Sequence, residues 1–188
     1  AFDPDALWAM QSWSLREPIV KAVPKSDLLI LDLNGGRCVK DDPCWGYPVV
    51  MGNLHNFGGR INMHGDLHLI ASNQYGRAHA KHDNVCGSGL FMESIMQNPV
   101  FYELAFEIPL HVGKVNIEEW LAGYASRRYG APSEKTAQAW LYLLEGPYQR
   151  RTNGTERSSI IAARPALNVK KSGPNHGLGI PYSPLLLW

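Results

Sequence analysis

Polar and aromatic side chains follow each of four short apolar segments of the chain. They are Gln11 and Trp13 after the first segment, Asp32 after the second, His55 and Asn56 after the third, and Glu93 after the fourth. Amides and carboxylates bind hydroxyl groups, and an indole ring stacks against the C–H face of a pyranose. Gathered in one place, these side chains would form a site for a sugar. Whether these side chains lie together depends on the strands and helices that position them.

The four apolar segments predict strands. They are short, unalternated and bounded by turn-forming residues, and they comprise Ala6–Met10, Leu28–Leu31, Pro48–Met51 and Gly87–Phe91. Segments of this kind are typical of strands that are buried on both faces of a parallel sheet. Because parallel strands end at the same edge of a sheet or barrel, we expect the side chains that follow them to converge there.

Helices are expected between and after these strands. One covers residues 18–23, with Pro18 at its first position, and another covers residues 67–75. A third opens at Asn98-Pro99, and its buried side is expected to comprise Val100, Leu104 and Phe106. The alternation of strands and helices predicts an α/β fold, either a doubly wound sheet or a (β/α) barrel. No Gly-x-Gly-x-x-Gly follows a strand, which counts against a dinucleotide-binding sheet.

Beyond residue 114 the pattern becomes helical. Asn116 is a candidate cap for one helix that ends near Gly130, and Ser133 is a candidate cap for a second helix that ends at Gly146-Pro147. Each helix has apolar residues at helical spacing, which we expect to be core: Ile117, Trp120, Leu121 and Tyr124 in the first, and Ala137, Trp140, Leu141 and Leu144 in the second.

Composition narrows the class of protein. The formal net charge is +1 and no long Lys or Arg run occurs, which argues against nucleic-acid binding by a basic surface. No apolar stretch reaches the roughly 18 residues of a membrane-spanning helix, so no membrane partner is expected. The start at Ala1, without Met and close to a predicted strand, suggests an internal piece of a longer polypeptide. Cys38 and Cys44 could form a disulfide, although free thiols are favoured.

Each candidate site residue also has a purely structural interpretation. Glu93 could be a solvated loop carboxylate, and Asp32 could cap a turn through its side chain. His55 could be a core imidazole whose hydrogen bonds go to backbone groups. Asn56 could be present because asparagine tolerates a positive φ. Trp13 could pack in the core rather than bind a sugar.

Other catalytic chemistries lack their signatures. A metal-dependent hydrolase could use histidines that lie close in sequence, namely His64, His68, His79 and His82. However, no further ligand completes a known metal motif, such as the Glu of His-Glu-x-x-His. We therefore expect no metal site and no cofactor. No Gly-x-Ser-x-Gly elbow exists for a serine nucleophile. Cys86 stands at the start of a predicted strand, where we expect it to be buried.

At this point the sequence resembles the α-N-acetylglucosaminidases of the lysosomal, heparan-sulfate-degrading type, with their plant and bacterial relatives. Six blocks carry the resemblance in order, and it weakens after about Gln149. The blocks are Ala6–Trp13, Leu29–Leu33, Leu54–Gly59, Gly87–Glu93, Gln97–Leu104 and Tyr124–Gly130.

The resemblance implies a (β/α)₈ TIM-type barrel followed by an all-helical domain. Residues 1–113 would be the C-terminal half of the barrel, residues 114–150 a helical segment that completes the barrel or leads to the helical domain, and residues 151–188 the start of that domain or an irregular tail. Glu93 would be the nucleophile of a retaining glycosidase, Trp13 would line the sugar pocket, and Asn56 would lie in the same rim. From their positions at the strand ends, we also expect His55 to contact the sugar, with Gln11 and Asp32 as supports.

The chain departs from the family in one way that matters. The acid/base glutamate of these enzymes lies in an Asn-Glu block upstream of the segment that matches Ala6–Trp13, so it is missing here. The expected partner is a carbohydrate with terminal α-linked N-acetylglucosamine, and the expected compartment is the lysosome, the vacuole or the cell exterior. The alternative is a non-catalytic half-barrel that binds sugar, forms homo-oligomers or pairs with a missing N-terminal half, because open sheet edges invite pairing.

Overall fold

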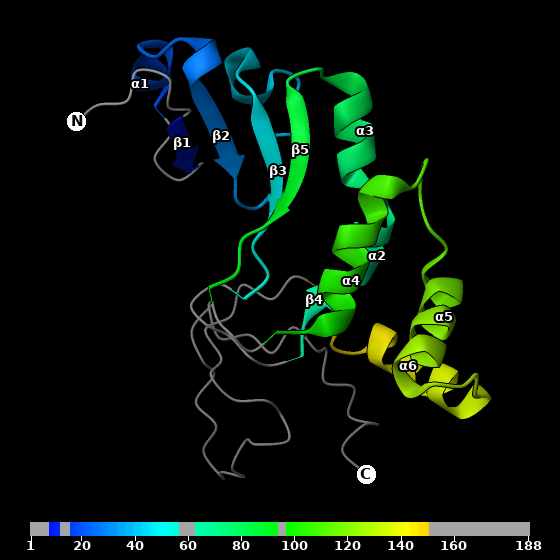
Figure 1. Ribbon diagram of the computed structural model, residues 1–188. Coiled ribbons are helices and arrows are strands. Elements are labelled where there is room, and N and C mark those ends of the chain that lie inside the picture. The colour runs from blue at the N-terminus through cyan, green and yellow to red at the C-terminus, as the bar shows by residue number, and fades with distance from the viewer. Residues whose placement is uncertain (1–7, 12–15, 57–62, 94–96, 151–188) are drawn as a thin grey trace, which may run out of the picture. The chain divides into compact units, whose positions relative to one another are not determined.

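The computed structural model describes residues 8–11, 16–56, 63–93 and 97–150 (Figure 1). These residues form two compact units, which we describe separately. The sheet unit takes its residues from Ala1–Leu54, Asn73–Phe91 and Ala105–Lys114. The helical unit takes its residues from His55–Ser72, Met92–Leu104 and Val115–Trp188.

Four parallel strands form the core of the sheet unit (Figure 1). Their order in the sheet is β1-β2-β3-β5, and their bounds are Trp8–Gln11, Leu28–Asp32, Val49–Asn53 and Val85–Leu90. Gln11 is in register with Leu31, and Asp32 is in register with Met51, so the carboxyl ends of these strands share one edge. The predicted strands and the predicted parallel α/β sheet are thereby confirmed.

One face of the sheet is fully covered. Leu28 and Ile30 of β2 and Val49 of β3 are buried to within 1%, whereas Leu29 and Leu31 of β2 are half-buried. The covering side chains include Val20 and Ala78. Each such aliphatic side chain stabilises the fold by about 1.5 to 3 kcal/mol. Burial on both faces was expected, and for β2 this is wrong, because the described residues cover the face of Leu29 and Leu31 only in part.

Short helices flank the strands of the sheet unit. They are α1 (Glu17–Lys21), the 3₁₀ turns η2 (Lys25–Asp27), η3 (Pro43–Gly46) and η4 (Ile108–Leu110), and α3 (Gln74–Lys81), which packs against β5. Pro18 lies in the first turn of α1, as its fixed φ predicts.

The helix predicted over residues 67–75 is two helices. The structure has α2 at Leu67–Ala71 and α3 at Gln74–Lys81. Asn73 lies between them in the left-handed region, with φ of 53°, and its side chain accepts the N–H of Gly76 at the start of α3. Asparagine tolerates this conformation better than most residues do. The apolar pattern runs through Asn73 without interruption, which is why the break was missed.

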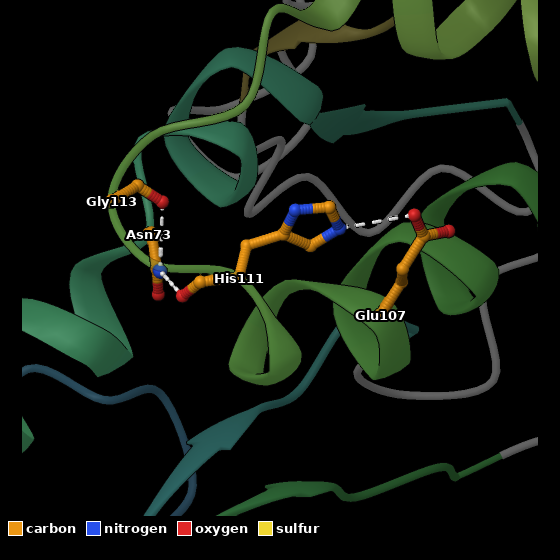
Figure 2. Close-up of polar contacts among 4 residues, drawn as sticks. All are labelled: Asn73, Glu107, His111 and Gly113. Atoms are coloured by element: carbon orange, nitrogen blue, oxygen red, sulfur yellow. Dashed lines mark hydrogen bonds and ion pairs between the residues drawn. The ribbon is translucent and has the colours of Figure 1, made fainter.

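The buried amide of Asn73 also holds a distant segment. Its Nδ2 donates to the carbonyl oxygens of His111, at 3.0 Å, and Gly113, at 2.9 Å (Figure 2). The same figure shows the exposed ion pair of His111 Nε2 with Glu107 Oε1, at 3.1 Å. Asn73 is only 1% exposed, so all its bonds are shielded from water.

The next helix, α4 (Pro99–Glu107), begins as predicted but presents a different buried side. Val100 and Leu104 are buried to within 1%, whereas Phe106 is 67% exposed. The prediction for Phe106 was wrong because a residue six positions after Val100 is turned to another side of a helix that has 3.6 residues per turn. Phe101 and Tyr102 are buried instead.

The helical unit contains a helical hairpin, α5 (Ile117–Tyr129) and α6 (Glu134–Glu145), beside α2. Asn116 caps α5 by accepting the N–H groups of Glu118 and Glu119, and Ser133 caps α6, as predicted. Trp120 stacks on Tyr124, which meets Trp140 edge to face. The predicted aromatic core of this hairpin is confirmed.

A two-stranded antiparallel ladder follows the hairpin. Strand β6 (Gln149–Arg150) pairs with β4 (Gly65–Asp66), and the N–H of Leu67 donates to the carbonyl of Tyr148 at 3.1 Å. Residues 115–150 therefore group with 55–72 and with 92–104. The domain limits expected at 113 and 150 remain a prediction, and the segment 151–188 lies outside the described residues.

Candidate active site

Two histidines stack face to face beneath the candidate site. The ring centroids of His55 and His64 are 4.1 Å apart, at an interplanar angle of 8°. His55 Nε2 donates to the carbonyl of His64 at 2.7 Å, and His64 Nε2 donates to the carbonyl of His55 at 2.8 Å. A carbonyl only accepts, so each bond places the proton of its ring on Nε2. The pair ties together the two ends of the segment between residues 55 and 64.

The surroundings of His55 are apolar. Its ring also stacks on Phe101, at 4.3 Å between centroids, and meets Tyr102 edge-on. Burial, together with the neighbouring His64, lowers the pKa of His55 from 6.5 to about 4. Its Nδ1 is buried and has no hydrogen-bond partner among the residues that the structure describes. The interpretation of His55 as a core imidazole bonded to backbone is confirmed, and its expected contact with a sugar remains a prediction.

Asn56 lies at the centre of the candidate site and is completely buried, at 0% exposure. Its Oδ1 accepts the backbone N–H of Glu93 at 3.1 Å and the hydroxyl of Tyr102 at the longer distance of 3.5 Å. Burial raises the pKa of Tyr102 to about 12, so this hydroxyl keeps its proton and acts as a donor. The sequence also allowed a positive φ at Asn56, and the structure does not have one at this residue.

Glu93 follows the end of β5 by three residues, and its side chain is exposed. An exposed carboxylate can be reached by a substrate, but exposure is equally expected of a solvated loop residue. The hydrogen bond from its backbone to Asn56 joins two sequence blocks that are 37 residues apart. The role of Glu93 as nucleophile remains a prediction.

Asp32, in the sheet unit, is 2% exposed at the end of β2. Its Oδ2 accepts the backbone N–H groups of Arg37, at 2.6 Å, and Cys38, at 3.1 Å. The interpretation of Asp32 as a cap of the following turn is therefore confirmed. Gln11 is the exposed last residue of β1, and Trp13 lies outside the described residues. Their contacts with a sugar remain predictions, as does that of Asp32.

The cysteines are free thiols. Cys38 and Cys44 are buried, and burial, with Asp32 nearby, raises the pKa of Cys38 above its usual range and that of Cys44 to about 11. Neither is a thiolate at neutral pH, so neither is a ready nucleophile. Cys86 is exposed, and its predicted burial is wrong because it points away from the face that buries Val85, its neighbour in β5.

Two residues of the candidate site were not singled out for it by the sequence. His64 was considered only as a metal ligand, and Tyr102 stood unremarked in the block Gln97–Leu104. Helical periodicity gives no signal for Tyr102, because it lies about 160° around α4 from the buried Leu104 and only about 40° from the exposed Phe106. In the part of the chain that the structure describes, no three His, Cys, Asp or Glu side chains gather as a metal site requires. No helix in that part is long and apolar enough to span a membrane.

Comparisons with known proteins give a consistent result. The α-N-acetylglucosaminidase (NAGLU) TIM-barrel domain matches residues 1–111, and the α-N-acetylglucosaminidase (NAGLU) C-terminal domain matches residues 120–184. Human α-N-acetylglucosaminidase is 28% identical over 194 residues, which cover 92% of this chain and 25% of that protein. The chain thus spans about a quarter of this relative.

Solved structures agree in fold. A family 89 glycoside hydrolase from Clostridium perfringens, in complex with 2-acetamido-1,2-dideoxynojirmycin, is 29% identical with a TM-score of 0.76, over 96% of this chain and 21% of that chain. A variant Clostridium perfringens enzyme in complex with its substrate GlcNAc-α-1,4-galactose gives the same values. These likenesses bear out the TIM-barrel class of the fold.

Proposed function

The chain belongs to the α-N-acetylglucosaminidase family, and from this we propose that the protein that carries it hydrolyses terminal α-linked N-acetylglucosamine with retention of configuration. Glu93 is the nucleophile of this reaction. The hydrogen bond between Asn56 and the backbone of Glu93 supports the proposal most directly, because it holds the backbone of the residue that carries the candidate carboxylate.

The stereochemistry of the substrate calls for an enzymic nucleophile. The equatorial 2-acetamido group of an α-glycoside can reach the anomeric carbon only from the face that the leaving group occupies. The substrate cannot assist its own cleavage, so a carboxylate must attack from the opposite face. Retention then requires a second carboxyl group about 5 to 5.5 Å away, which protonates the departing oxygen.

The proton donor lies outside these residues in our proposal. The chain covers about a quarter of the human relative, and the family places its acid/base glutamate upstream of the first strand segment. The residues of this chain then form part of the barrel rim, with Glu93 below the anomeric carbon and Trp13 against the sugar ring. A lysosomal, vacuolar or secreted location follows from the same family resemblance.

The test is the Glu93→Gln variant of the complete enzyme, assayed with an aryl α-N-acetylglucosaminide. Loss of the nucleophile should lower kcat by about three orders of magnitude or more. Glu103→Gln is the matched control, since Glu103 is an exposed glutamate of α4 and should retain full activity. A Glu93→Gln variant with more than about a tenth of the wild-type kcat would contradict the assignment.

One observation favours the non-catalytic alternative. In the described part of the chain, β1 and β5 each have one strand neighbour in the four-stranded sheet. A half-barrel of this kind would pair its open edges with a second copy or with a further part of the barrel. Sedimentation of the 188-residue chain tests the pairing of its edges, and a glycosidase assay of the complete protein that carries it separates the two functions: a complete protein that binds the sugar and cleaves nothing supports the alternative.

A further inference from the structure

Asn56 is the most deeply buried polar residue of the candidate site. It is 0% exposed, whereas Glu93, whose backbone it binds, is exposed. A side chain that contacts a substrate needs some surface at the mouth of the site, and Asn56 shows none. The contact that the structure shows for Asn56 is with the backbone of Glu93, and its expected contact with the sugar remains a prediction.

We infer that Asn56 is a positioning residue: its side-chain oxygen holds the peptide of Glu93 so that the carboxylate stands in a fixed place for attack. The inference rests on the proposed function of Glu93. The bond is made to the N–H of Glu93 itself, so any rotation of that peptide must break it. The amide nitrogen of Glu93 is bonded directly to its Cα. A fixed N–H therefore limits the position of the Cα and of the side chain attached to it.

The oxygen of Asn56 is itself held in place. Tyr102 donates to it from α4, and Tyr102 in turn packs against His55, the residue before Asn56. His55 is locked by its two reciprocal hydrogen bonds with His64. The residues that hold the backbone of Glu93 therefore come from three segments of the helical unit, at 55–56, at 64 and in α4.

Positioning of this kind acts on the rate of attack. A retaining glycosidase forms a bond between the carboxylate oxygen and the anomeric carbon while the bond to the leaving oxygen breaks. A displacement of the nucleophile by about 1 Å can lower such a rate by about 100-fold, while the binding of the sugar is unaffected. A residue that touches the sugar would instead weaken its binding.

The experiment uses the complete enzyme, the single variants Asn56→Ala, Asn56→Asp and Tyr102→Phe, the double variant Asn56→Ala/Tyr102→Phe, and the control Tyr142→Phe. Each is assayed for kcat and KM with an aryl α-N-acetylglucosaminide. Each is also titrated calorimetrically with 2-acetamido-1,2-dideoxynojirmycin, the ligand of a structural relative. The stoichiometry of the titration counts intact sites, and its Kd reports contacts with the sugar.

The expected results differ from those of any other role. Asn56→Ala should lower kcat about 100-fold with KM, Kd and stoichiometry unchanged, and Asn56→Asp, which keeps an oxygen acceptor, should recover most of that loss. Tyr102→Phe should lower kcat only a few-fold, because its bond is the longer one, and should add nothing in the Asn56→Ala background. Tyr142→Phe is the control, since Tyr142 is 67% exposed on α6.

Three outcomes would overturn the inference. A Kd weakened tenfold or more by Asn56→Ala, with kcat retained, would make Asn56 a sugar contact. A stoichiometry that falls in step with kcat would make its role structural only. An unchanged kcat would remove any role. Activity retained by Glu93→Gln would instead overturn the proposed function, so the two failures are distinguishable.

Discussion

Asn73 and Asn56 are buried asparagines of different units that use the same amide chemistry for different ends. Asn73, in the sheet unit, is 1% exposed and binds the N–H of Gly76 and the carbonyls of His111 and Gly113. Asn56, in the helical unit, is 0% exposed and binds the N–H of Glu93. The partners of Asn73 belong to a helix start and a connecting segment, whereas one partner of Asn56, Glu93, carries an exposed carboxylate.

The difference teaches that burial and hydrogen bonding do not by themselves separate a scaffold residue from a site residue. What separates them is the group that the bonds hold in place. Asn73 has a strained backbone that its three bonds offset, so its loss should appear as a loss of stability. Asn56 has no positive φ, and its loss should appear first in the rate of reaction.

The largest expected effect sharpens this comparison. Asn73→Ala should lower the free energy of unfolding by about 3 to 4 kcal/mol, because it removes three hydrogen bonds and leaves two carbonyls without their donor. Chemical denaturation would measure the loss, and kcat per folded molecule should stay at the wild-type value. Asn73→Asp separates the contributions, since it keeps the bond to Gly76 and loses both bonds to carbonyls. A destabilisation by Asn56→Ala that exceeds that of Asn73→Ala would break the comparison.

Acid should act on the surroundings of Asn56 and not on those of Asn73. The pKa of His55 is lowered from 6.5 to about 4 in the folded protein by burial and by His64. Between these values the unfolded chain binds a proton that the folded chain does not, so stability falls as the pH falls from about 6.5 to about 4, by about 3 kcal/mol in total. Below pH 4 both states are protonated and the loss is complete.

Hydrogen exchange, corrected for its intrinsic pH dependence, would measure this effect locally. The amide of Leu67, which donates to Tyr148, should lose protection on acidification, whereas the amide of Arg77, which donates to Asn73, should not. His55→Gln, which cannot be protonated, should remove the difference. Equal loss of protection at both amides, or none at Leu67, would contradict the prediction.

The smallest expected effect concerns Asp32, and it tests whether Asp32 is a scaffold residue or a site residue. Its carboxylate holds the turn through Arg37 and Cys38, so Asp32→Asn should lower stability by about 1 to 2 kcal/mol and leave KM unchanged. The thermal midpoint and KM of the complete enzyme measure the two quantities. A raised KM at unchanged stability would instead place Asp32 among the sugar contacts.

The sequence predicted the elements better than their contacts. The four strands are short apolar runs between turn residues, and the caps Asn116 and Ser133 precede clear helical patterns, so local signals were enough. The break at Asn73 was missed because a left-handed residue leaves no mark on hydrophobic periodicity. Phe106 was misplaced because apolar character was given more weight than its angular position on the helix.

The candidate site was predicted only in part, for a physical reason. Glu93 and Asn56 were both proposed from their positions after strands, but the bond between them spans 37 residues and depends on loop geometry. The reciprocal bonds of His55 and His64 likewise require two peptides to meet at a set angle. Hydrophobic patterns report which residues are buried and say little about which polar atoms meet there.

The ladder of β4 and β6 has a consequence for the order of folding during synthesis. Gly65 and Asp66, next to His64, pair with Arg150 and Gln149, which leave the ribosome much later. Until β6 emerges, β4, which directly follows His64, lacks its partner strand. Long-range pairing of this kind is slow and leaves the nascent polypeptide open to aggregation. Chaperone binding to stalled chains should therefore decrease once residue 150 has cleared the exit tunnel.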